Sequence, residues 1–107
     1  MKNVLIVKTH KTGGRAWAAW KITEDKAKDL EYVVSVNGKR VTVYFVHDYT
    51  MGTFWGQDYQ RVVFDLEEMD ESFDGDETNG VLGSLIKQGV DLFAAGWVVK
   101  LAEVPTI

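Results

Sequence analysis

The dipeptide Asn37-Gly38 constrains the fold of this chain more than any other feature of its sequence. It lies in the middle of a segment rich in β-branched and aromatic residues (residues 32–46). Asn-Gly between two such runs is the strongest short signal for a β-hairpin, because both residues readily adopt positive φ. A type I′ turn at this dipeptide would pair Val34 with Val41. We therefore expect an antiparallel hairpin here.

Three further segments have the composition of β-strands. Each is short, rich in apolar or β-branched residues, and bounded by turn-forming residues. In the second of them, alternation places Val62, Phe64 and Leu66 on an inward face and Asp65 and Glu67 on the outward face. The three predicted strands span residues 2–9, 59–67 and 97–104.

The segment after the first predicted strand has two interpretations. Gly13-Gly14 fits a two-residue hairpin turn, which would lead into a strand over residues 15–22 and a short helix over residues 24–29. Alternatively, Ala16, Trp20 and Ala27 lie on one stripe of an amphipathic helix that continues to residue 30. We favour the strand, because Gly-Gly is a better hairpin turn than a helix start.

A second helix is predicted near the C-terminus. Residues 79–95 carry apolar side chains at helical spacing, and Thr78 or Asn79 can cap the start. Gly96 fits the left-handed position that ends many helices.

Together these segments predict an α+β fold in one domain, residues 1–107. The expected architecture is a mostly antiparallel sheet of five to six strands, with one C-terminal helix packed on a face. If residues 15–30 are helical, the element order becomes that of a ferredoxin-like variant. Hydrophobic residues make up 46% of the chain, which is the range of globular proteins and argues against disorder.

The chain has no cysteine, which excludes disulfides, thiolate metal sites and thiol chemistry. The apolar run near the N-terminus, Val4 to Val7, is shorter than the roughly 7–15 residues of a signal peptide. No stretch approaches the about 20 apolar residues of a membrane helix. These features predict a cytoplasmic protein with no membrane segment.

Charge is unevenly distributed along the sequence. Residues 1–61 contain ten Lys or Arg and six Asp or Glu, whereas residues 62–107 contain two and ten. The overall net charge of −4 therefore combines a basic first part with an acidic second part. Such asymmetry is evidence about binding partners and not about fold.

No motif indicates catalysis, a metal or a cofactor. The two histidines, His10 and His47, would need a carboxylate such as Asp48 to form a zinc site. No serine lies in a nucleophile-elbow context. Residues 74–85 resemble a calcium loop, but glycine falls one place late and the twelfth position is Leu85 instead of glutamate. We therefore expect a protein that is not an enzyme.

The first candidate binding surface combines acidic and aromatic residues. Residues 65–77 hold eight carboxylates and no lysine or arginine, and we interpret them as a solvated loop. The preceding loop, residues 47–58, is rich in large side chains that could anchor a partner. The alternative is an acidic loop without function and aromatics buried under the sheet. The candidate partner-binding residues are Tyr49, Phe54, Trp55, Asp65, Glu67, Glu68, Asp70, Glu71, Asp74 and Asp76.

The second candidate surface is basic and lies near the N-terminus. Basic residues neutralise phosphates, and aromatic rings stack on unpaired bases, so this pattern is typical of single-stranded nucleic-acid binding. The alternative is a solvated strand face with tryptophans in the core. The candidate nucleic-acid-binding residues are Lys8, Lys11, Arg15, Trp17 and Lys21, with Trp20 beside them.

The sequence favours a small acidic protein-binding domain. Its composition is typical of an inhibitor or immunity-type protein, such as a phage or bacterial accessory protein. The expected partner is a protein with a basic surface, such as a nucleic-acid-processing enzyme. A single-stranded nucleic-acid-binding module is the alternative.

Overall fold

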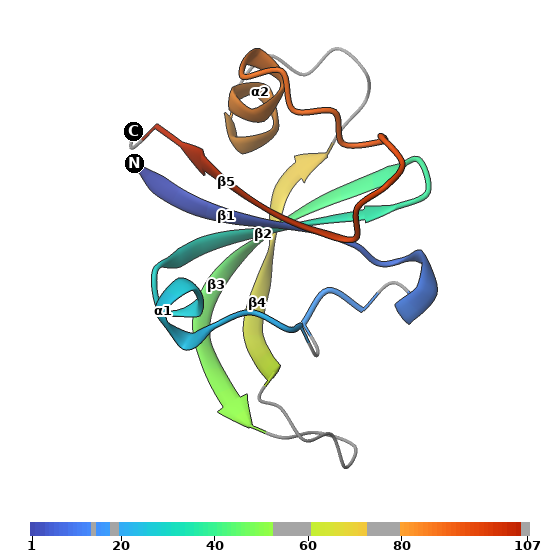
Figure 1. Ribbon diagram of the computed structural model, residues 1–107. Helices are drawn as coiled ribbons and strands as arrows, with labels where there is room; N and C mark the ends of the chain where they lie inside the picture. The colour runs from blue at the N-terminus through green and yellow to red at the C-terminus, as the bar shows by residue number, and fades with distance from the viewer. Residues whose placement is uncertain (14, 18–19, 53–60, 73–79, 106–107) are drawn as a thin grey trace.

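The computed structural model describes residues 1–13, 15–17, 20–52, 61–72 and 80–105 (Figure 1). Five strands, two short helices and one 3-10 turn occur in this part of the chain. In chain order they are β1 (Lys2–Lys8), η1 (His10–Thr12), α1 (Glu24–Ala27), β2 (Leu30–Asn37), β3 (Arg40–Gly52), β4 (Arg61–Ser72), α2 (Gly80–Lys87) and β5 (Val99–Val104).

The strands form one sheet in the order β4-β3-β2-β1-β5. β1 pairs with β2 in parallel, and the other neighbours are antiparallel. The prediction of a mostly antiparallel α+β fold is thus confirmed, with one parallel pair that the sequence did not indicate. Val4 to Val7 are all fully buried, because β1 has neighbours on both edges and packing on both faces. Such a strand has a continuous apolar run instead of an alternating pattern.

The predicted hairpin is present as β2 and β3, but its register differs from the expected one. Asn37 pairs with Arg40, so Gly38 and Lys39 form the two-residue turn and Val34 pairs with Val43. Gly38 has φ 62° and takes the first central position of the turn. Glycine adopts that conformation without steric cost, so the observed turn is unstrained at this residue.

The predicted hairpin at Gly13-Gly14 is wrong. β1 is followed by η1, and Gly13, with φ 68°, follows that turn. β1 pairs with β2 and β5 instead of with the segment that follows it. The described residues of this segment, 15–17 and 20–22, form no strand. Trp20 forms an isolated bridge with Val62, and the Trp17 carbonyl accepts a hydrogen bond from the Phe64 amide. The helical alternative is also wrong, because α1 covers only Glu24–Ala27, and the ferredoxin-like order does not arise.

The second helix is shorter than predicted and is followed by β5, so it is not the C-terminal element. It ends at Lys87 because Gly89, not Gly96, takes the left-handed position, with φ 81°. The amides of Gly89 and Val90 bond back to the carbonyls of Ile86 and Leu85, at 3.0 and 3.1 Å. These bonds form a Schellman ending. Neither described helix is long and apolar enough to cross a membrane.

The core consists of two clusters. Alternate residues of β1 divide between them, since Val4 and Ile6 belong to the first cluster and Leu5 and Val7 to the second. The clusters therefore lie on opposite faces of the sheet. The first also contains Val81, Leu82 and Leu85 of α2. The second also contains Ala16, Trp20, Ala27, Leu30, Val62 and Phe64.

Candidate functional site

The acidic segment is an edge strand and not the loop that we predicted. Residues 65–72 belong to β4, which is the outermost strand on one side of the sheet. Asp65, Glu67 and Glu68 are exposed. Glu67 and Glu68 point to opposite faces, because successive strand residues alternate. The outer side of the sheet therefore carries carboxylates on both faces.

For the remaining residues of the acidic prediction, the structure describes no side-chain position. Asp70 and Glu71 lie in strand β4. Asp74, Asp76, Phe54 and Trp55 lie outside the described residues.

A groove lies beside the acidic strand. It has a volume of about 480 Å³ and is lined mostly by aromatic and aliphatic side chains, with one cation and one anion. Its residues come from the segment that follows η1 and from the two outer strands. They are Gly13, Arg15, Ala16, Trp17, Tyr44, Phe64, Asp65 and Leu66.

Backbone hydrogen bonds hold one wall of the groove in place. The amide and carbonyl of Trp20 bond to Val62 at 3.0 and 2.9 Å, and the amide of Phe64 donates to the Trp17 carbonyl at 2.8 Å. The segment thus covers the outer edge of β4 as far as Phe64. The Trp20 side chain is buried, and its Nε1 donates to the Ala16 carbonyl at 2.7 Å. The Trp17 side chain remains 49% exposed.

Tyr44 contributes a neutral phenol to the groove. Partial burial raises the pKa of this phenol, and the negative charge of Glu68 raises it further, while Arg40 acts in the opposite direction. The phenol therefore stays protonated at neutral pH and can donate a hydrogen bond. Tyr44, Phe64 and Leu66 were missed as candidate site residues. The strand alternation marked Phe64 and Leu66 only as core, and nothing in the sequence placed Trp17 beside them.

Tyr49, which we predicted as an exposed anchor, is only partly exposed. It packs against the second core cluster. Its hydroxyl donates to Glu24 Oε1 at 3.3 Å, which links β3 to α1. This residue therefore has a structural role in the fold.

The candidate basic residues do not form one surface. Lys8 donates to the carbonyl of Ala94, and its ammonium lies 4.4 Å from the centre of the Trp97 ring. Lys11 and Lys21 are exposed. Arg15 is also exposed and lies 5.9 Å from the Trp17 ring centre, at the groove. Of the five predicted residues, the structure brings only Arg15 and Trp17 to a common pocket.

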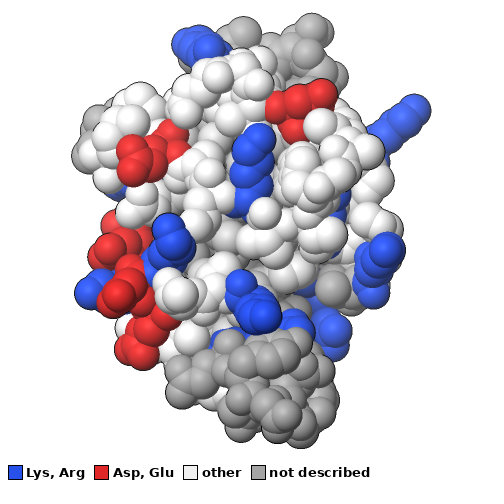
Figure 2. Space-filling view, in the orientation of Figure 1, with Lys and Arg blue, Asp and Glu red and all other residues white. Residues whose placement is uncertain are grey.

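Charge is unevenly distributed over the face drawn in Figure 2, but not as the two parts of the sequence suggest. Acidic side chains gather on the left over α1, which belongs to the basic first part of the chain, and are mixed there with Lys or Arg. The right-hand side, where η1 and the β2–β3 turn lie in Figure 1, carries Lys and Arg almost alone.

His47 belongs to β3 and not to a loop. Its Nε2 lies 3.4 Å from Glu67 Oε1, and its ring contacts Phe45 edge to face. His10 is exposed in η1. Within the described ranges, no three His, Asp or Glu side chains form a group that could hold a metal ion.

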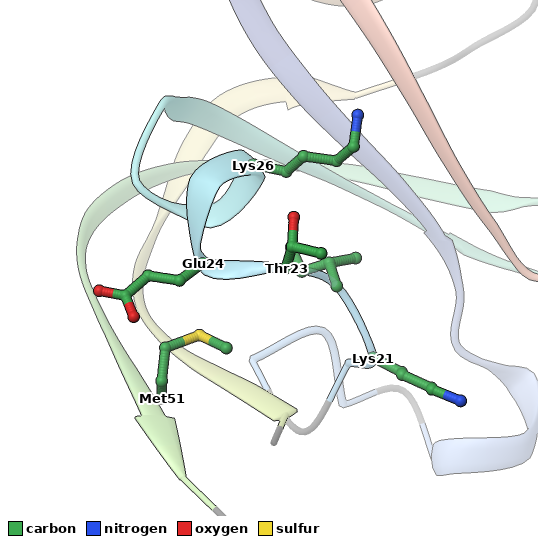
Figure 3. A pocket seen from close by; sticks show the side chains of 6 residues that line it. Lys21, Thr23, Glu24, Lys26 and Met51 are labelled. Atoms are coloured by element: carbon green, nitrogen blue, oxygen red, sulfur yellow. The ribbon is translucent and has the colours of Figure 1, made fainter. Parts of the chain in front are cut away.

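A second pocket, of about 570 Å³, lies beside α1 and is lined by Lys21, Ile22, Thr23, Glu24, Lys26 and Met51 (Figure 3). The ends of Lys21, Glu24 and Lys26 point in different directions. Small-molecule sites usually combine an apolar lining with a few convergent polar groups. This pocket lacks that convergence, so the groove beside β4 is the better candidate site.

Comparison with known proteins gives no relative: no family model, curated protein or solved structure matches the chain. The interpretation of the site therefore depends on its own geometry.

Proposed function

We propose that this protein is a protein-binding domain that binds a basic surface of its partner along β4. One observation carries the proposal: the exposed carboxylates of the edge strand lie directly beside an open groove that Trp17, Tyr44 and Phe64 line. In a protein interface, charged residues at the rim steer association, and buried aromatic residues supply most of the binding energy. The β4 edge combines both features.

A basic partner surface is complementary to Asp65, Glu67 and Glu68. Many basic protein surfaces bind nucleic acid, because they neutralise phosphates. An acidic strand that covers such a surface would compete with the nucleic acid. The proposal therefore includes an inhibitor or immunity-type role against a nucleic-acid-processing enzyme.

Nucleic-acid binding is the second candidate, favoured by the exposed pair Arg15 and Trp17. A base could stack on Trp17 while Arg15 contacts a phosphate. Glu68 acts electrostatically on Tyr44 of the same groove, and Asp65 and Glu67 are exposed on the same strand, so a polyanion would meet carboxylates at this edge. This repulsion makes a basic protein the better match.

The test uses charge removal at the strand. The partner is first captured by a photo-crosslinking residue placed at Arg15, which lines the groove and leaves the Trp17 anchor in place, and association is then measured at low and high salt. We expect the variant Asp65→Ser, Glu67→Ser, Glu68→Ser to associate at least about tenfold more slowly at low salt, because steering by exposed charges is lost. Trp17→Ala should instead speed dissociation.

The matched control removes three carboxylates elsewhere, by Asp25→Ser, Asp29→Ser and Glu103→Ser. Both variants have the same net charge, so a purely global effect of charge would slow them equally. Equal slowing would contradict the proposal. Tight binding of an oligothymidylate that is abolished by Arg15→Glu would support the nucleic-acid candidate instead.

A further inference from the structure

We infer that the partner binds as an extended strand that pairs with the free part of the β4 edge, with an apolar side chain in the groove. This inference rests on the proposed function and specifies how the partner is recognised. Strand addition to an exposed sheet edge is a common mode of peptide recognition. It makes a prediction about the partner's backbone that charge complementarity alone does not make.

The first argument is the state of the backbone along β4. The amides of Val62 and Phe64 point away from β3, as their hydrogen bonds to the carbonyls of Trp20 and Trp17 show. Backbone direction in a strand repeats every second residue, so the peptide groups of Leu66 and Glu68 point the same way. Among the described residues, no backbone segment bonds to this edge beyond Phe64. Unpaired N–H and C=O groups of this kind are a template for another strand.

The second argument is the position of the groove. Leu66 both lines the groove and belongs to the free edge. A strand paired there would place the side chain opposite Leu66 beside Trp17 and Phe64. A large apolar side chain fits that position, since alternate side chains of an added strand fill pockets on one face.

The third argument is charge complementarity. In an antiparallel added strand, the residues just before and just after the apolar residue lie opposite Glu67 and Asp65, and their side chains point to the face opposite the groove. The residue two positions before the apolar residue lies opposite Glu68, and its side chain points to the groove face. Lysine or arginine fits each of these positions. For an antiparallel strand, the expected pattern is therefore basic-basic-apolar-basic.

A second copy of this chain does not fit the edge. Pairing β4 with β4 would bring the carboxylates of Asp65, Glu67 and Glu68 against their own copies, and like charges opposite each other are destabilising. On the other edge strand, β5, the Glu103 carbonyl accepts a hydrogen bond from Gln88 Nε2 at 2.7 Å, so at least this group is not free to pair with β4 of a second copy. The occupant that we propose is a basic segment of another protein.

The test uses a synthetic peptide, Lys-Lys-Leu-Lys preceded by two threonines and blocked at both ends. No residue follows the last lysine, because the edge is already covered at Phe64. Two forms carry one backbone N-methyl group, either on the leucine or on the lysine that follows it. Only alternate amides of an added strand face β4, so one N-methyl group should weaken binding at least about tenfold while the other has little effect. Both forms have the same charge and the same side chains, and each is the control for the other.

Amide hydrogen exchange gives a second, independent measurement. In the free protein the amides of Leu66 and Glu68 should exchange fast, and the unmodified peptide should slow them at least about tenfold. The amide of Glu67, which faces β3, should be protected already. Protection of Leu66 in the free protein would overturn the inference, because the edge would then be occupied.

Failure of the inference can be distinguished from failure of the proposed function. If both N-methyl peptides bind equally and Asp65→Ser, Glu67→Ser, Glu68→Ser weakens both, strand addition is wrong and the acidic binding surface stands. If the peptide does not bind at millimolar concentration, strand addition is wrong. If the three-carboxylate variant leaves binding of both the peptide and the captured partner unchanged, both proposals are wrong. A dimer that forms through β4 without peptide would also overturn the inference.

Discussion

The phenol of Tyr49 donates a hydrogen bond to Glu24 Oε1 at 3.3 Å, and this contact contributes to its raised pKa. Partial burial raises the pKa of Tyr49, and the Glu24 carboxylate raises it further because a second negative charge nearby is unfavourable. The unfolded chain has the ordinary tyrosine pKa of about 10. The contact therefore contributes stability at neutral pH, which is lost as pH rises from about 10 through the raised pKa.

Replacing Glu24 by glutamine should lower the pKa of Tyr49 towards its ordinary value. The amide removes the negative charge but still provides an oxygen that can accept the hydrogen bond. NMR of ring-labelled tyrosine across alkaline pH measures the change. Asp25→Asn is the control, because Asp25 is also exposed on α1 but pairs with Lys28, at 3.6 Å, and not with this phenol. An unchanged pKa in Glu24→Gln would show that the carboxylate has no effect.

The two nearby tryptophans show what sequence cannot resolve at the level of single residues. Trp17 and Trp20 have similar neighbours in the sequence, and either could be buried. The structure buries Trp20 because its indole nitrogen reaches the Ala16 carbonyl, which satisfies the polar atom inside the core. Trp20 also forms an isolated bridge with Val62 of β4, a contact between distant segments that neither the strand nor the helix interpretation predicts.

At the scale of elements, regular local patterns were predicted well and connections were not. The β2–β3 hairpin could be predicted because its turn residues and strands are adjacent in sequence. The pairing of β1 with β2 and β5 could not, since it depends on contacts between distant segments. The acidic part of β4 was mistaken for a loop because carboxylates outweighed the strand signal. Leu66 and Met69, both partly buried, were the available evidence for a strand.

The turn between β2 and β3 gives a prediction at this scale. Gly38 has φ 62°, and a β-carbon added there would meet no atom within 4 Å. The cost of a substitution is therefore conformational and not steric. We expect Gly38→Val to destabilise the fold by about 1–2 kcal/mol, because β-branched residues avoid this region. Gly38→Asn should cost clearly less, since asparagine tolerates it. Chemical denaturation of both variants measures the difference, and equal costs would contradict the conformational explanation.

At the scale of the whole molecule, one sheet joins two core clusters. Each cluster is covered by different segments. Residues of α2 belong to the first cluster, whereas Ala16, Trp20 and Ala27 of α1 belong to the second. β1 and β2 supply alternate residues to both clusters, so neither cluster can lose these strands without exposing the other. The groove and the acidic edge lie on the outer strands, next to the second cluster. A rigid sheet therefore supports the proposed binding edge.

This arrangement predicts a single cooperative unfolding transition. Leu82 of the first cluster is fully buried and Leu30 of the second is 6% exposed, so each Leu→Ala change should cost about 2–5 kcal/mol. Because the two residues lie in different clusters, their effects should add within about 0.5 kcal/mol. Far-UV circular dichroism and tryptophan fluorescence should give coincident denaturation curves in both variants and in the double variant. Trp20 reports on the second cluster and Trp97 packs against the first, so fluorescence follows both. If Leu30→Ala produced two separated transitions, the clusters would be independent folding units, and the edge formed by β4 could unfold without the rest of the sheet.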